Sequence, residues 1–200
     1  MSASATRQKI LDAAQHLLET GGLARLTTKE LAQVAGCAEG TLFKHFGSKE
    51  NLVLAVVEEN APRFHAAVSH ARRAGRSVAA NLSEIAHACL QFSEKLIPLG
   101  ASLLGDAALL ERHRALDPGR GPKEAFALIA DYIVQEQQAG RIDARVDPAS
   151  IALLLFGPCF HRVFIRQVVG KNPPPADDRK FIATLVSAIT RGLESTRRAQ

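Results

Sequence analysis

The chain has 200 residues, which allows one or two domains with a sizeable core, and 46% of them are hydrophobic, an ordinary fraction for a globular protein. No run of about 18 apolar residues and no N-terminal signal segment occurs, so we expect a cytoplasmic protein with no membrane partner. The net charge of +5 suits a polyanionic partner, and three widely spaced cysteines indicate reduced thiols rather than disulfides or a zinc site, so no metal or cofactor is expected.

The first predicted helix covers residues 6–19, where apolar residues recur on one helical face, and Gly21 and Gly22 are expected to end it. Charge does not mark this part of the chain as a nucleic-acid site. Residues 1–50 contain six basic and five acidic side chains, so most of the positive surplus lies further along. A binding site near the N-terminus must therefore be recognised from the pattern of residues.

The stretch TTKELAQVAGCAEGTLFKHF contains the start and stop signals of two short helices. Thr27 and Glu30 form a capping box, so a helix is predicted over residues 28–35. Gly36 can adopt the left-handed backbone that ends a helix and turns the chain, and residues 40–44 make a second short helix.

The two short helices have an apolar set that is predicted to pack together, namely Leu31, Ala32, Val34, Leu42 and Phe46. The polar side chains left over are Thr27, Thr28, Lys29, Glu39, Thr41, Lys44, His45 and Lys49. This spacing fits two interpretations: an ordinary helical hairpin with a solvated polar face, or a helix-turn-helix that reads DNA.

Helices are also predicted along the middle of the chain. Ser48 caps a helix that Pro62 is expected to kink or break, because an interior proline removes a hydrogen bond and clashes with the preceding turn. A breaker at residues 72–75 follows. The next helix begins at Ser77, carries apolar residues at spacings of three and four, and is predicted to end near Pro98.

A further helix is predicted to carry Leu103, Leu104, Leu109 and Leu110, and the loop DPGRGP separates it from a helix that stops at Gly140.

Two long helices are predicted at the end of the chain. Asp147 before Pro148 is an N-cap with proline at the first helical position, and Gly170 ends the helix that begins there. Asp177 or Asp178 caps the last helix. No alternating strand pattern and no internal repeat is found, so the chain is predicted to be all-α with about nine helices.

The segment IALLLFGPCF in the first of these long helices is almost continuously apolar. It could be a fully buried helix of the monomer core. It could also belong to a partner surface, where two helices from each of two copies form a four-helix bundle around a two-fold axis.

The run LTTKELAQVAG, followed by GTLFKHF and SKE, resembles the N-terminal DNA-binding domain of the tetracycline-repressor (TetR) family of transcription regulators over residues 6–54. The resemblance implies a three-helix helix-turn-helix domain over residues 1–54 and a helical ligand-sensing and dimerisation domain over residues 55–200. It also implies a repressor that binds a palindromic operator in double-stranded DNA as a homodimer and is released by a small apolar or amphipathic effector.

Carried over residue by residue, the resemblance makes the short helix that starts at Thr27 lie across the DNA backbone. It places residues 39–44, at the second short helix, in the major groove. The implied DNA-contacting residues are Thr27, Thr28, Lys29, Glu39, Gly40, Thr41, Leu42, Phe43, Lys44, His45 and Lys49. Phe43 departs from the family, many of whose members have a tyrosine that reaches a phosphate, so that contact is not expected here. Cys37 replaces the more usual valine and is expected to be a small core residue.

The resemblance assigns the dimer contact to the last two long helices, with candidate residues Leu153, Phe156, Phe160, Val163, Phe164, Phe181, Leu185 and Ile189. Candidates for lining an effector pocket are Phe64, His87, Phe92, His113, Phe126 and Tyr132. An aromatic residue at helical spacing is also an ordinary core residue, and the sequence alone leaves that alternative open.

Two other classes of function are alternatives to a regulator. No G-x-S-x-G, P-loop, H-E-x-x-H or dinucleotide-binding pattern supports an enzyme. A helical dimer that binds small molecules or another protein without binding an operator is the remaining alternative.

Overall fold

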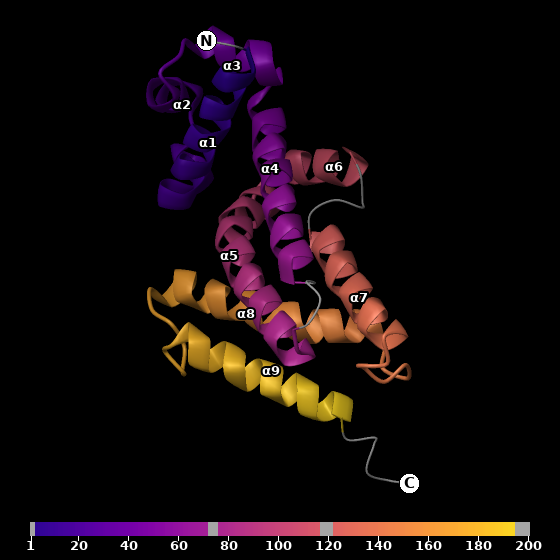
Figure 1. Ribbon diagram of the computed structural model, residues 1–200. Helices are drawn as coiled ribbons and strands as arrows, with labels where there is room; N and C mark the ends of the chain where they lie inside the picture. The colour runs from indigo at the N-terminus through magenta and orange to yellow at the C-terminus, as the bar shows by residue number, and fades with distance from the viewer. Residues whose placement is uncertain (1–2, 72–75, 117–121, 195–200) are drawn as a thin grey trace. The chain divides into compact units, whose positions relative to one another are not determined.

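The computed structural model describes residues 3–71, 76–116 and 122–194, and over these residues the chain forms α-helices and no strand (Figure 1). The all-α prediction is therefore confirmed. In chain order the described helices are α1 (Ala3–Arg25), α2 (Thr28–Ala35), α3 (Glu39–Phe46), α4 (Lys49–Ala71), α5 (Val78–Leu104), α6 (Ala107–Leu116), α7 (Pro122–Gln138), α8 (Pro148–Val169) and α9 (Asp178–Glu194).

The chain divides into two compact units. Unit 1 comprises residues 1–60 and 95–120, and unit 2 comprises residues 61–94 and 121–200. Helices α4 and α5 each contribute one part to each unit, and α6 belongs to unit 1. The expected functional boundary after residue 54 stays a prediction.

Unit 1 has a core to which α1, α2, α3 and the first half of α4 all contribute. Its buried residues include Ile10, Leu11, Ala14, Leu17, Leu18, Leu26, Leu31, Leu42, Phe46, Leu52, Val53 and Val56. Helix α1 runs through Gly21 and Gly22 to Arg25, so the predicted end of this helix is wrong. A glycine costs only about 1 kcal/mol in a helix interior, and the burial of the apolar face of α1 outweighs that cost.

The boundaries of α2 agree with the prediction, whereas α3 begins at Glu39, one position earlier than expected, and ends at Phe46, two positions later. The packing set of this pair needs one correction. Val34 is 49% exposed, because the hairpin buries the side of α2 that carries Leu31 and Ala32. Cys37 is half-buried against the same core, in line with the expected core role.

The predicted end of α5 at Pro98 is wrong, and so is a break of α4 at Pro62, whereas the alternative of a kink at Pro62 stays a prediction. Helix α4 continues across Pro62 to Ala71, and α5 continues through Pro98 to Leu104. A proline removes one hydrogen bond, but both helices keep burying apolar residues along one face, which offsets that loss. The break falls instead at Gly105 and Asp106, so the four leucines expected on one helix are divided between α5 and α6. The predicted breaker at residues 72–75 and most of the DPGRGP loop lie outside the described residues.

The ends of α7 and α8 and the starts of α8 and α9 agree with the glycines and capping residues predicted from the sequence. Gly140 and Gly170 have positive φ angles of 68° and 78° where α7 and α8 end. Asp147 caps α8 by accepting a hydrogen bond from the Ser150 amide over 2.8 Å. Between the two alternatives for the last cap, Asp177 takes the role, since its Oδ1 accepts from the Arg179 amide over 2.7 Å.

Helix α8 runs through the core of unit 2 and contacts both α7 and α9. Among the described helices it is the one long and apolar enough to cross a membrane, by length and composition alone. Its inner face is buried in unit 2, which is the situation of a core helix; the buried residues are Ile151, Ala152, Leu155, Phe156, Cys159, Arg162 and Val163.

Candidate nucleic-acid interface

The turn between α2 and α3 is held by short-range hydrogen bonds. Thr27 Oγ1 accepts from the Glu30 amide over 3.1 Å, which caps α2 as the sequence predicted. At the other end Gly36 has φ 65°, and the Cys37 amide donates to the carbonyl of Ala32 over 3.0 Å. This left-handed residue turns the chain sharply and fixes the direction in which α3 leaves the turn.

Helix α3 has one buried face and one outward face. Leu42 is 4% exposed and is part of the core of unit 1, so the expectation that its side chain contacts DNA is wrong. Gly40 and Lys44 lie at the centre of the exposed face, and Phe43 beside them is 48% exposed. A Cβ added at Gly40 would meet no atom within 4 Å, so another molecule can approach the helix backbone closely at this point.

The remaining predicted residues occupy the rim of this face. Thr27 and Lys29 are exposed and Thr28 is half-buried at the start of α2, whereas Thr41 and His45 are half-buried along α3. Glu39, the first residue of α3, is exposed.

A shallow apolar depression brings several predicted residues together at the junction of α2, α3 and α4. It is lined by Leu26, Thr27, Thr28, Leu31, Leu42, Phe43, Phe46, Ser48, Lys49 and Leu52. Ser48 Oγ accepts from the Asn51 amide over 3.2 Å, so the predicted cap of α4 is present and Lys49 stands at the first position of that helix. Helix starts favour phosphate, because their amides and dipole present positive charge.

Two side chains of this region were not predicted from the sequence. The guanidinium of Arg7 lies 5.3 Å from the centroid of the Phe46 ring, which brings the beginning of α1 next to the end of α3. Asn51 donates from Nδ2 to the Phe46 carbonyl over 3.0 Å. Neither contact has a signal in residue spacing, because each depends on how separate helices pack.

Comparison with known proteins decides the family. Residues 10–56 match the family model described as bacterial regulatory proteins, tetR family. The nucleoid occlusion factor SlmA of Marinobacter nauticus is 31% identical over 150 residues, which cover 73% of this chain and 73% of SlmA. The chain belongs to the TetR family. It is therefore a TetR-family transcription regulator with a helix-turn-helix DNA-binding domain.

Other relatives agree at the level of fold or domain. The HTH-type transcriptional repressor AcnR of Corynebacterium glutamicum is 39% identical over 64 residues, but the match spans only 32% of this chain and 34% of AcnR. A putative TetR-family regulator from a Rhodococcus species superimposes with a TM-score of 0.72 at 23% identity and covers 96% of this chain and 100% of its own. The fatty acid degradation regulator FadR of Bacillus halodurans has a TM-score of 0.74 at 18% identity, with 94% and 96% covered.

In this TetR-family chain, the six predicted effector-pocket residues are not all together. Phe64, Phe92 and Phe126 join Phe156 in an aromatic cluster of unit 2, with ring centroids 4.9 to 6.3 Å apart from one neighbour to the next. Phe156 was expected at the dimer contact, but it is only 3% exposed and lies at the centre of this cluster.

The other three pocket candidates take part in none of these ring contacts. Tyr132 is 1% exposed, and among the described residues its hydroxyl has no hydrogen-bond partner of normal geometry. Burial raises the pKa of Tyr132 above its usual range, and neighbouring Asn81 partly opposes that rise. His87 is exposed on α5. His113 is on α6, which belongs to unit 1, whereas the aromatic cluster belongs to unit 2.

The dimer candidates of the TetR-family chain divide into buried and accessible residues. Val163 is fully buried and Ile189 is 8% exposed, so like Phe156 they are buried within the single chain. Leu153 is 55% and Phe164 43% exposed, and Phe160, Phe181 and Leu185 are half-buried. The prediction omitted three further exposed apolar residues of α8, namely Leu154, Val168 and Val169.

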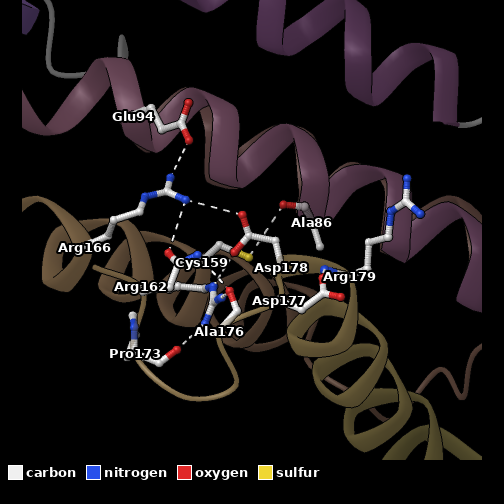
Figure 2. Close-up of polar contacts among 11 residues, drawn as sticks. Ala86, Glu94, Cys159, Arg162, Arg166, Pro173, Ala176, Asp177, Asp178 and Arg179 are labelled. Atoms are coloured by element: carbon white, nitrogen blue, oxygen red, sulfur yellow. Dashed lines mark hydrogen bonds and ion pairs between the residues drawn. The ribbon is translucent and has the colours of Figure 1, made fainter. Parts of the chain in front are cut away.

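A polar network that the sequence did not predict joins α8 to the start of α9 (Figure 2). Arg162 is 2% exposed and donates from Nε to Asp178 over 2.6 Å, from Nη1 to the Pro173 carbonyl over 3.0 Å and from Nη2 to the Ala176 carbonyl over 3.1 Å. Arg166 binds the second oxygen of Asp178 over 3.3 Å and pairs with Glu94 on α5. These bonds hold the connection between α8 and α9 against both helices.

Proposed function

We propose that this regulator binds a palindromic operator as a homodimer, with α3 of each copy in the major groove, and that it acts in the cytoplasm as a repressor released by a small apolar or amphipathic effector. The observation that carries the proposal is the outward face of α3. It combines a residue without a side chain at Gly40 with the exposed cation Lys44, and the phosphate-favouring helix starts at Thr27 and Lys49 flank it.

In this proposal the residues at the rim of the outward face of α3 contact DNA phosphates, and the residues at the centre of that face contact bases. Thr27, Thr28 and Lys49 stand at helix starts, where amides and side chains can hold phosphate oxygens. Lys44 is suited to the acceptors of guanine, and Glu39 can accept from the amino group of cytosine. Rim contacts would supply affinity and central contacts would supply choice of sequence.

Dimerisation supplies the second reading helix. Leu153, Phe164 and Val168 lie on one side of α8, with His161 and Gly157 between them, and a Cβ added at Gly157 would meet no atom within 4 Å. A second copy packed against this side would remove the exposed apolar area from water and could bring its backbone close at Gly157. A two-fold axis through such a contact relates two α3 helices, which is the arrangement that a palindrome requires.

The effector would act by linkage. A molecule that binds better to the state with the wrong spacing of the two α3 helices lowers DNA affinity by its difference in affinity for the two states. The aromatic cluster of Phe64, Phe92 and Phe126 supports an apolar molecule as the effector. A solved FadR from Bacillus subtilis, whose fold is similar at a TM-score of 0.71, is described in complex with stearoyl-CoA.

A helical dimer without operator binding is the second candidate, because Phe43 places a large apolar ring on the outward face of α3. Selection of bound duplexes from a random pool, followed by gel shift at several salt concentrations, separates the two. The proposal expects a palindromic consensus and affinity that falls steeply with salt. Recovery of no preferred sequence, or binding that salt does not weaken, would reject operator binding.

A further inference from the structure

The side-chain amide of Asn51 bridges two helices of unit 1. Asn51 lies in the first turn of α4, where its backbone N–H donates to Ser48 Oγ over 3.2 Å. Its Nδ2 donates to the Phe46 carbonyl over 3.0 Å, and its Oδ1 accepts from Arg112 Nη2 over 2.8 Å. Both ends of the Asn51 amide are therefore used, one toward α3 and the other toward α6.

The Phe46 carbonyl lies at the C-terminal end of α3. Phe46 is the last residue of α3, and Gly47 ends the helix with φ 74° while its amide donates to the Phe43 carbonyl over 2.8 Å. The last carbonyls of a helix have no partner within that helix, so an outside donor fixes the position of the helix end. The Phe46 ring is in the core of unit 1, so Asn51 completes the fixation of this end of α3.

Arg112 brings a helix from much later in the chain to this point. It lies on α6, which starts anew after Gly105 and belongs to unit 1 together with α1, α2 and α3. Its neighbours Glu111 and Arg114 pair with each other over 2.6 Å on the exposed surface of α6. Arg112 instead donates to Asn51, so α6 is connected to the end of α3 through the Asn51 side chain.

We propose that Asn51 is a positioning residue that ties the end of α3 to α6 through Arg112, so that the placement of α6 sets the orientation of the DNA-reading helix. This inference rests on the proposed operator binding. It assigns α6 a role in DNA affinity that does not require any α6 residue to touch DNA.

The salt dependence of binding separates positioning from direct contact. A cation that neutralises a phosphate contributes about one unit to the slope of log affinity against log salt concentration. Arg112 donates to Asn51 in unit 1, so its removal is expected to lower operator affinity without changing that slope. Loss of Lys49, which is proposed to touch phosphate, provides the contrasting result in the same assay.

A double-mutant cycle on operator affinity tests the bridge, with duplexes from the random-pool selection as the probe. Asn51→Ala and Arg112→Ala are each expected to weaken operator binding about 5-fold, and the double variant is expected to be no weaker than Asn51→Ala. Arg112→Lys keeps a donor for Asn51 Oδ1 and should bind within about 2-fold of the parent. Arg114→Ala is the matched control on the same helix and should bind as the parent does.

Thermal unfolding of each variant checks that the proteins are folded at the assay temperature. Independent losses that multiply in the double variant, a slope lowered by about one unit in Arg112→Ala, or parental binding by Asn51→Ala would overturn the bridge. Failure of the parent protein to bind any selected duplex would instead overturn operator binding, and with it the role of the bridge.

Discussion

Arg162 on α8 and Asp178 at the first position of α9 form an ion pair in which Nε and Oδ1 are 2.6 Å apart and the arginine is 2% exposed (Figure 2). The guanidinium also lies 4.7 Å from the centroid of the Phe181 ring. Such a cation has lost its water, so it depends on the carboxylate, the two carbonyls and the ring around it. The pair therefore fixes how α9 leaves α8, and these are the helices proposed to dimerise.

Replacing Asp178 with asparagine is expected to destabilise the protein by about 2 to 3 kcal/mol, because it leaves the buried Arg162 without its carboxylate. Urea unfolding at neutral pH measures the change. Glu111→Gln removes one partner of the exposed pair with Arg114 and should cost about 0 to 1 kcal/mol. Equal effects of the two substitutions would contradict the importance given to burial.

Replacing Phe164 with glutamate is expected to raise the dimer dissociation constant by at least about 100-fold, because an unpaired charge would have to be buried in the contact. Phe164 is 43% exposed in the protomer, so the fold should persist. Sedimentation equilibrium measures the association. The control is Val163→Ala, which creates a cavity in the protomer core but should shift the dissociation constant less than about 5-fold. Unchanged association of Phe164→Glu would remove this side of α8 from the proposed interface.

Local signals and long-range packing account for what the sequence could and could not predict. The caps at Thr27 and Asp147 and the turn at Gly36 were predictable, because each depends on residues within a few positions. The continuation of α1 past Gly21 and of α5 past Pro98 was not, because burial against other helices outweighs a local cost.

In the candidate site, too, features set by neighbouring residues were predictable and features set by packing between helices were not. The resemblance carried by the α2 and α3 motif pointed to the outward face of α3, and the family assignment is confirmed. The buried and exposed sides of α8 could not be separated, since its apolar run is almost continuous and offers no period. The partners of Arg162 and Asn51 come from other segments and carry no sequence signal at all.

Replacing Lys49 with alanine is expected to weaken binding to every DNA sequence and to lower the salt slope by about one unit, as for one lost phosphate contact. Fluorescence anisotropy with operator and random duplexes at several salt concentrations measures both quantities. If the slope stays at the parental value, Lys49 is not a phosphate contact.

Replacing Lys44 with alanine is expected to cost about 1 to 3 kcal/mol at the cognate site and to relax the choice at one base pair. The exposed position of Lys44 near the centre of the α3 face is the reason for this expectation. A second selection from the random pool with the variant identifies the relaxed position. Equal losses on cognate and random duplexes would reject base reading by Lys44.

Glu84 on α5 gives the protein a pH-dependent contribution to stability. The hydrogen bond with His70, opposed by burial and reinforced by Arg76, lowers the pKa of Glu84 below its ordinary value of 4.5. A lowered pKa stabilises the fold above the unfolded-state value and is lost as the pH falls through the folded-state value. The difference in unfolding free energy between the parent and Glu84→Gln should be largest above pH 4.5 and shrink below it. A difference that grows as the pH falls would contradict this sign.

The most direct test of operator reading by two copies of α3 is the binding of the intact protein to a selected palindrome and to the same duplex with one half-site scrambled. Analytical ultracentrifugation gives the stoichiometry and anisotropy gives the affinity. The account predicts two protomers on the palindrome and at least about 100-fold weaker binding when one half-site is scrambled. One protomer per duplex, or equal affinity for the two duplexes, would contradict it.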